Sequence, residues 1–187
     1  MKKKRGSKIK RKRNDKKFIF LALLLFLIYI VSVRVFPREY KDIVEKYSAE
    51  YNIDTSLIYA VISTESGFRE KVESDAGAAG LMQITEDTGI FIARRLNIED
   101  YERDYLFDPN LNIMMGTYYL MYLDGLFQNK DKMLAAYNAG PNRVKIWIDE
   151  GVFDDKISIP YGETRRYVKK VKIREKIYKI LYFFDKG

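Results

Sequence analysis

The sequence predicts an all-α domain that follows one N-terminal membrane-spanning helix. Apolar residues recur at spacings of three and four, and the stretches with this spacing are bounded by helix start and stop signals. A separate run of sixteen uncharged residues, 18–33, predicts the membrane helix. With 187 residues, of which 47% are hydrophobic, the chain can build about one globular core.

The N-terminal segment is typical of a membrane anchor with a basic tail. Residues 2–17 hold eleven Lys or Arg and one acid, which leaves 23 basic and 25 acidic residues, a net charge of −2, for the rest of the chain. The overall charge of +8 therefore belongs to the tail, and a nucleic-acid-binding function is not indicated. At ~1.5 Å per residue the run 18–33 covers ~24 Å, and Val35 and Phe36 extend it. The basic flank predicts that the tail is cytoplasmic and the domain extracytoplasmic.

A cleaved signal peptide has a similar layout. It requires small residues before the cut, and Val31-Ser32-Val33 match that requirement poorly, so we expect an uncleaved anchor in a single-pass protein of the cell membrane. The expected organisation is a cytoplasmic tail at 1–17, an anchor at 18–36 and a domain at 37–187.

Seven helices are expected after the anchor. Asp54 or Thr55 is placed to cap the second of them, which ends at Glu65 with Gly67 as a stop. Asp108-Pro109 combines a cap with a proline at the first helical position and starts a long helix. The expected ranges are 39–51, 54–65, 86–96, 109–127, 131–138, 142–150 and 163–184.

The chain contains no histidine and no cysteine. This excludes Ser-His-Asp and Cys-His hydrolysis and removes the usual zinc ligands, so neither a metal nor a cofactor is expected. Carboxylates are the only ordinary side chains left to transfer protons near neutral pH. Glu65 is the main candidate because it ends an apolar helix, where desolvation and the negative end of the helix dipole both disfavour its charged form. A solvent-exposed glutamate at a helix end is the alternative interpretation.

Four segments carry a family resemblance through their order along the chain. They are Glu65-Ser66-Gly67, GAAGLMQI at 77–84, AAYNAGPNRV at 135–144 and YGETRRYV at 161–168. In this order they resemble the lytic transglycosylase domain, a lysozyme-like helical module that cleaves bacterial cell-wall glycan. The resemblance covers residues 40–181, and it is specific because four short segments agree in sequence and in order.

The resemblance implies a peptidoglycan lytic transglycosylase. Such an enzyme cleaves the β-1,4 bond between N-acetylmuramic acid and N-acetylglucosamine and forms a 1,6-anhydromuramoyl product. Glu65 would protonate the oxygen between the sugars and then act as base toward the C6 hydroxyl, with the substrate's acetamido group stabilising the cation. Peptidoglycan strands are the implied partner, and no protein partner is indicated.

The resemblance also implies a set of substrate-binding residues. Gln83 would hydrogen-bond to an acetamido or hydroxyl group, and Tyr137 would stack on a sugar or bond to the catalytic carboxyl. Glu163, in the first turn of the last helix, would stay ionised and position Tyr137 or contact substrate. Arg165 is expected in a structural ion pair and Tyr167 in core packing. The full set is Ser66, Met82, Gln83, Tyr137, Asn138 and Glu163.

Two alternatives stay open at this point. A hydrolytic lysozyme-type muramidase needs a second carboxylate, and Glu70, Glu73 and Asp75 follow Glu65 in one loop that is also typical of a solvated surface. A non-catalytic peptidoglycan-binding scaffold of an envelope machine would need no proton donor at Glu65. The chain departs from the family pattern at residues 68–72 and at Thr85, which stands where a proline usually opens a helix. We expect these departures to affect which substrate is preferred at the edge of the cleft.

Overall fold

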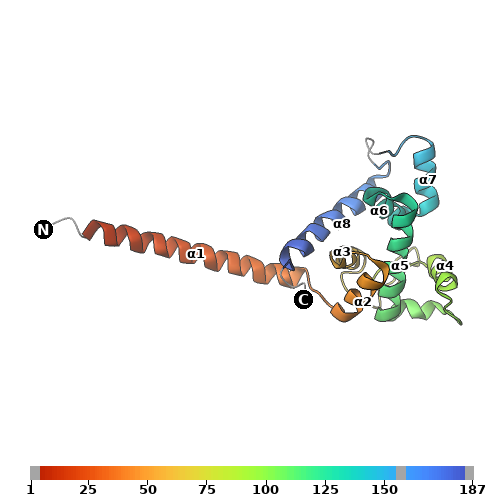
Figure 1. The fold of residues 1–187 in the computed structure, drawn as a ribbon, viewed down its shortest axis with the longest axis horizontal. Helices are drawn as coiled ribbons and strands as arrows, with labels where there is room; N and C mark the ends of the chain where they lie inside the picture. Colours follow the sequence, from red (N-terminus) through yellow and green to blue (C-terminus); the bar gives the residue numbers. More distant parts are fainter. Residues whose placement is uncertain (1–4, 155–158, 184–187) are drawn as a thin grey trace. The chain divides into compact units, whose positions relative to one another are not determined.

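The computed structural model describes residues 5–154 and 159–183, which form two compact units that divide after Pro37 (Figure 1). All regular structure in these ranges is helical, which confirms the all-α prediction, and β-structure is limited to isolated bridges of Ala79 with Glu73 and Ile84. The elements are α1 (Arg5–Val35), α2 (Lys41–Tyr51), α3 (Thr55–Glu65), α4 (Glu86–Leu96), η1 (Arg103–Phe107), α5 (Pro109–Phe127), α6 (Lys130–Ala139), α7 (Pro141–Asp149) and α8 (Gly162–Leu181).

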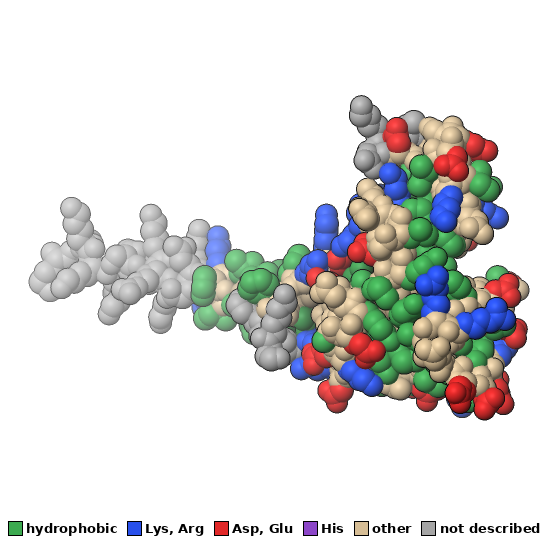
Figure 2. All heavy atoms as spheres, turned by 45° about the vertical axis from the view of Figure 1, so that its right-hand side comes forward, with side chains coloured by type: hydrophobic (Ala, Val, Ile, Leu, Met, Phe, Trp, Pro, Cys, Tyr) green, Lys and Arg blue, Asp and Glu red, His purple; other side chains and the backbone are tan. Residues whose placement is uncertain are grey.

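The first unit consists mainly of α1. Its segment Lys16–Val35 has 20 residues and a mean hydropathy of 2.7, so it is long and apolar enough to cross a membrane. Figure 2 shows hydrophobic side chains along this segment. The helix extends back to Arg5, so the described part of the predicted basic tail is helical, and residues 1–4 of that tail lie outside the described residues.

The second unit is built around α3. Its residues from Ser56 to Ser63 are all buried, because this helix is apolar on every side. Helix α8 packs along α3: the rings of Tyr59 and Tyr178 stack with centroids 5.3 Å apart, and the Arg174 guanidinium donates to the carbonyl and hydroxyl of Ser63. Glu65, the last residue of α3, therefore stands at the end of the most enclosed helix of the domain.

The second unit has a hydrophobic core of its own. Its buried apolar residues run from Val44 to Tyr178, whereas the membrane-length segment of α1 has no buried residue. On the face drawn in Figure 2, hydrophobic side chains gather in the middle of the domain and charged ones surround them. A contiguous core of this kind is the property of a domain that folds on its own.

The helix boundaries agree with the predicted ones to within a few residues. The Asp54 carboxylate accepts from the Ser56 amide at 2.9 Å, and the Asp108 carboxylate accepts from the Leu111 amide at 2.8 Å, so both predicted caps are confirmed. The short helix η1 was not predicted, because five residues carry too little periodicity. The last helix ends at Leu181, and residue 184 of the predicted range lies outside the described residues.

The long loop between α3 and α4 is fixed by Asn112 on α5. The fully buried Asn112 amide donates to the carbonyl oxygens of Ala79 (3.0 Å) and Leu106 (2.8 Å) and accepts from the Met82 amide (2.7 Å). Gly80 leaves the space for it: a Cβ atom there would lie 2.0 Å from the Leu106 carbonyl oxygen, and its φ of +77° favours glycine. The buried Asn112 amide thus fixes the conformation of the loop that follows Glu65 in the sequence.

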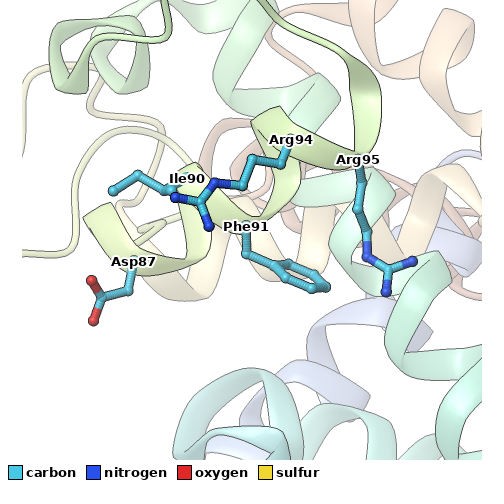
Figure 3. A pocket seen from close by; sticks show the side chains of 5 residues that line it. All are labelled: Asp87, Ile90, Phe91, Arg94 and Arg95. Atoms are coloured by element: carbon cyan, nitrogen blue, oxygen red, sulfur yellow. The ribbon is translucent and has the colours of Figure 1, made fainter.

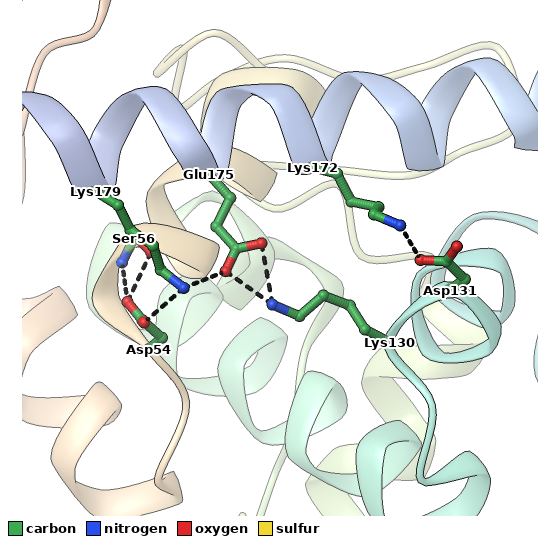
Figure 4. A network of polar contacts seen from close by, with 7 residues as sticks. All are labelled: Asp54, Ser56, Lys130, Asp131, Lys172, Glu175 and Lys179. Atoms are coloured by element: carbon green, nitrogen blue, oxygen red, sulfur yellow. Dashed lines mark hydrogen bonds and ion pairs between the residues drawn. The ribbon is translucent and has the colours of Figure 1, made fainter.

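An ionic network ties α8 to α3 and α6 (Figure 4). The Glu175 carboxylate, whose side chain is 6% exposed, lies 2.8 Å from the ammonium groups of both Lys130 and Lys179, and Lys179 also reaches Asp54 at 3.2 Å. Burial alone would raise the pKa of Glu175, but the hydrogen bonds from Lys130 and Lys179 outweigh it and lower the pKa. The network therefore stabilises the fold through an ionised glutamate.

We expect Glu175→Gln to lower the free energy of unfolding of the domain by ~1–2 kcal/mol at pH 7, since charge-assisted hydrogen bonds become neutral ones while the lysines stay half exposed. The native pKa of Glu175 lies below its unfolded value of about 4.3, so this stabilisation is complete above that pH and is lost as the pH falls through the native pKa. Urea titrations at neutral and acidic pH measure the difference. The exposed Glu150→Gln is the matched control, and equal effects of the two variants would contradict the prediction.

Candidate active site

The site is centred on the carboxyl group of Glu65 at the C-terminal end of α3. The Tyr167 hydroxyl on α8 donates to Glu65 Oε1 at 2.6 Å, so one oxygen of the carboxyl is held by protein, and Glu65 as a residue is partly exposed. Burial raises the pKa of Glu65 to about 7, although the Tyr167 hydrogen bond and the charge of Lys170 both lower it. Desolvation therefore decides the balance, and a large share of Glu65 keeps its proton near neutral pH.

A second tyrosine closes the site from α6. The Tyr137 hydroxyl donates to the Met82 carbonyl at 2.8 Å. Burial and the negative charge of Glu65 raise the pKa of both Tyr137 and Tyr167 well above the usual value, so both phenols stay neutral donors. Segments far apart in sequence, from α3, α6, α8 and the loop before α4, thus meet around one acid.

Some predicted residues have structural partners near this centre. The Gln83 side-chain amide donates to the carbonyls of Val72 (3.1 Å) and Gly80 (2.9 Å), so its NH2 group holds the loop in place. Met82 is fully buried, and a Cβ on Gly116 would lie 2.4 Å from its sulfur, so its side chain packs in the core. Their contacts with substrate stay predictions, and for Met82 they would involve the backbone.

The other predicted residues differ in exposure. Ser66 is 2% exposed and its hydroxyl donates to the Ile62 carbonyl at 3.3 Å, so it completes the end of α3. Asn138 and Glu163 are exposed, at the end of α6 and in the first turn of α8. The Tyr137 hydroxyl is bonded to the Met82 carbonyl. The expected roles of Glu163 in positioning Tyr137 or contacting substrate, and of Asn138 in contacting substrate, stay predictions.

Tyr167 is the residue whose role the sequence did not reveal. It was expected only to pack, and it is 8% exposed, but its hydroxyl is the direct partner of Glu65. The signal was available in part, because a buried tyrosine needs a partner for its hydroxyl. Arg165, expected in an ion pair, instead donates to the Pro160 carbonyl at 3.5 Å.

The carboxylates considered for hydrolysis are mostly engaged elsewhere. Glu70 accepts from the Tyr40 hydroxyl at 2.6 Å, and Glu73 forms an ion pair with Arg103 at 2.6 Å. Asp75 is exposed. Among the residues that the structure describes, no cluster of three acidic or other metal-ligating side chains could hold a metal ion.

A pocket of about 540 Å³ opens along α4 (Figure 3). Its lining residues share one face of the helix: Asp87, Ile90, Phe91, Arg94 and Arg95. Aromatic rings connect it to the site, since the centroids of Phe91 and Tyr119 lie 6.5 Å apart and those of Tyr119 and Tyr137 lie 5.6 Å apart. Tyr119 is buried, so these rings pack within the domain and connect the wall of the pocket to Tyr137.

The fold and the site together define an all-helical domain with one protonated glutamate in a tyrosine-lined setting. Residues 42–159, more than half of the chain, match the family model described as Transglycosylase SLT domain. The chain belongs to this family, which confirms the resemblance drawn from the four sequence segments.

Relatives share the domain but are longer. The chain is 39% identical over 153 residues to the soluble lytic murein transglycosylase of Escherichia coli K12, covering 77% of this chain and 23% of that protein. It is 32% identical over 189 residues to the membrane-bound lytic murein transglycosylase C of Edwardsiella ictaluri, covering 83% and 52%. The chain therefore spans about a quarter to a half of the length of these relatives.

Solved structures show the same fold. The 70 kDa soluble lytic transglycosylase of E. coli superposes with a TM-score of 0.71 at 36% identity, over 78% of this chain and 25% of that one. Its complex with bulgecin A gives a TM-score of 0.72 at 36% identity, over 81% and 25%. An inactive glutamate-to-glutamine mutant of Slt from Pseudomonas aeruginosa gives 0.69 at 30% identity, over 78% and 24%. The expected lysozyme-like transglycosylase fold is thereby confirmed.

We expect Tyr167→Phe to raise the pKa of Glu65 above about 7, by about one unit, because the hydrogen bond that stabilises the carboxylate is removed. Carbon-13 NMR titration of the glutamate carboxyls measures it directly. Tyr137→Phe is the matched control, since that hydroxyl bonds to Met82 and not to Glu65. An unchanged pKa in Tyr167→Phe, or an equal rise in both variants, would show that Tyr167 does not set the protonation of Glu65.

Proposed function

We propose that the domain is a peptidoglycan lytic transglycosylase that cleaves between N-acetylmuramic acid and N-acetylglucosamine. The observation that carries the proposal is the position of Glu65 at the end of the buried helix α3, where the Tyr167 hydroxyl holds one of its oxygens and burial raises its pKa to about 7. An acid that must protonate a leaving oxygen and then take up a proton works best when its pKa lies near the ambient pH. Glu65 meets both requirements with one group.

Glu65 performs both steps of the proposed reaction. Tyr167 holds Oε1, which leaves Oε2 to donate its proton to the oxygen between the sugars. The bond from that oxygen to the muramoyl C1 breaks, and the neighbouring acetamido group stabilises the cationic carbon. The Glu65 carboxylate then takes the proton of the C6 hydroxyl as this oxygen bonds to C1. The product is a 1,6-anhydro ring, no water is consumed, and Glu65 regains its proton.

The engagement of the loop carboxylates favours this route over hydrolysis. A muramidase needs a second carboxylate as nucleophile or as base for water. Glu70 is bonded to Tyr40 and Glu73 to Arg103, so neither side chain is available without breaking a contact. The Tyr167 hydroxyl that donates to Glu65 and the Tyr137 hydroxyl stay neutral, so neither can act as a second carboxylate, and of the three loop carboxylates the exposed Asp75 is the remaining candidate.

The relatives support the same reaction class. Both the soluble E. coli protein and the membrane-bound Edwardsiella protein are named lytic murein transglycosylases, and this chain matches them across its domain. The inactive Pseudomonas mutant differs from its parent by a glutamate-to-glutamine change, which agrees with a reaction that depends on one carboxyl. We infer that Gln83, Tyr137, Asn138 and Glu163 contact the glycan around Glu65, with Ser66 and Met82 contributing through the backbone.

The proposal places the enzyme at a membrane. The segment Lys16–Val35 has the length and hydropathy of a membrane-spanning helix, and basic residues precede it. By the positive-inside rule the domain from residue 37 on is extracytoplasmic, where peptidoglycan lies. Residues 1–17 are then the cytoplasmic tail and residues 18–36 the single-pass anchor.

We expect the purified domain, residues 38–187, to release 1,6-anhydromuropeptides from cell-wall sacculi and Glu65→Gln to reduce this release about 10²–10⁴-fold, because glutamine cannot transfer a proton. Its melting temperature should not fall, since a desolvated carboxyl is replaced by a neutral amide. The exposed Glu99→Gln is the control and should retain full activity.

Mass spectrometry of the released products separates the candidate functions. Anhydro products support the proposal. Products heavier by one water identify a muramidase, and Glu70→Gln, Glu73→Gln and Asp75→Asn then show which carboxylate takes part. A folded domain that binds sacculi but releases no soluble product is a non-catalytic scaffold.

The membrane topology has its own test, which the absence of cysteine makes simple. Single-cysteine variants Ser7→Cys and Lys145→Cys of the full chain are exposed to a membrane-impermeant maleimide in spheroplasts. We expect labelling at position 145 in intact spheroplasts and labelling at position 7 only after lysis. Reversed accessibility, or recovery of the chain in the alkaline-soluble fraction, would contradict a single-pass anchor with an extracytoplasmic domain.

A further inference from the structure

Helix α8 has two faces with different environments. The inner face packs on α3 and α6 and buries Tyr167, Val168, Val171, Glu175 and Tyr178. The opposite side presents one straight row, which we call the outer stripe. Its members follow spacings of three and four and are all exposed: Arg166, Lys169, Ile173, Lys176 and Ile180.

The positive charge of the domain is concentrated in α8. Residues 162–181 contain eight basic and two acidic residues, a net charge of +6, although the chain after residue 17 carries −2 in total. The inner cations have partners: Lys179 contacts Glu175 and Asp54, and Lys172 contacts Asp131 at 2.6 Å. Within the described part of the chain no carboxylate forms an ion pair with Arg166, Lys169 or Lys176.

The outer stripe is also apolar to an unusual degree for a solvent-facing row. The side chains of Ile173 and Ile180 are 48% and 76% exposed, and both lie between the unpaired cations. A soluble polyanion would use the cations but gain little from isoleucines. A surface of anionic phospholipid uses both, because its phosphates attract the ammonium groups while its acyl boundary accepts the apolar ones.

We propose that the outer stripe of α8 is a membrane-contact face that lays the domain on anionic phospholipid. The proposal rests on the membrane anchoring put forward above. The linker strengthens it: α1 ends at Val35 and α2 begins at Lys41, so residues 36–40 allow a reach on the order of 17 Å. A domain tethered this closely meets the lipid surface continually, and a few weak contacts suffice to orient it.

The contact face has a consequence for the enzyme. Tyr167 lies on the inner face of the same helix and holds Glu65. If the outer stripe lies on lipid, α8 is fixed along the membrane and the Glu65 carboxyl is held at a constant height above it. The stripe would thereby select the layer of glycan that is cut.

The test uses vesicles and the anchor-free domain, residues 38–187, whose core is complete. We expect it to sediment with vesicles that contain about 30 mol% phosphatidylglycerol and not with phosphatidylcholine alone, and to dissociate as the ionic strength rises. Lys169→Gln with Lys176→Gln should weaken partitioning about thirty-fold at low ionic strength. Ile173→Ser with Ile180→Ser should weaken it several-fold at every ionic strength.

Matched variants on other faces separate the stripe from total charge and total hydrophobicity. Lys71→Gln with Lys145→Gln removes the same charge, and Ile146→Ser removes an isoleucine that is 53% exposed on α7. These controls should bind vesicles nearly as well as the parent. Absence of vesicle binding, equal binding to both lipids, or equal losses in stripe and control variants would each overturn the proposal. Release of anhydromuropeptides from sacculi by the same preparations tests the catalytic proposal separately.

Discussion

The structure depends on the burial of α3, whose last residue is Glu65. Eight consecutive residues of this helix, Ser56 to Ser63, are buried by its neighbours, and Glu65 follows two positions later with partial exposure. Desolvation there outweighs a hydrogen bond and a nearby lysine and raises the pKa of Glu65 to about 7. The same apolar packing that stabilises the fold therefore also raises the pKa of the proposed proton donor.

Helix α8 is the second organising element. Through Tyr167 it fixes one oxygen of Glu65, and through Glu175 it is bonded to Lys130 at the start of α6 and, by way of Lys179, to the cap of α3. A shift of α8 along its axis would disturb the acid and the ionic network together. Among the residues that the structure describes, the cations of the outer stripe form no ion pair with a carboxylate and its isoleucines are exposed, which is the basis of the proposed membrane contact.

The loop before α4 shows how a buried polar group positions a site at a distance. Asn112 is bonded to two backbone groups of that loop, at Ala79 and Met82, and to the Leu106 carbonyl of η1, and Gly80 leaves space for its side chain. The Met82 carbonyl then receives the Tyr137 hydroxyl, so the aromatic side of the site depends on a side chain of α5 that touches no reacting atom. A single buried amide is well suited to this because each unmade hydrogen bond in the interior costs free energy.

The sequence by itself determined the helices and their caps, because these follow from local periodicity and from Asp54 and Asp108 as caps. The absence of histidine and cysteine, together with the family resemblance, also made Glu65 the candidate acid. Only the tertiary structure decided which groups surround Glu65. Tyr167, the partner of Glu65, lies 102 positions away from it in the sequence. The Gln83 side chain donates to a backbone carbonyl of the loop, and the Met82 side chain packs against Gly116 in the core. Contacts of this kind depend on how helices pack, and packing is a property of the whole chain that no local pattern contains.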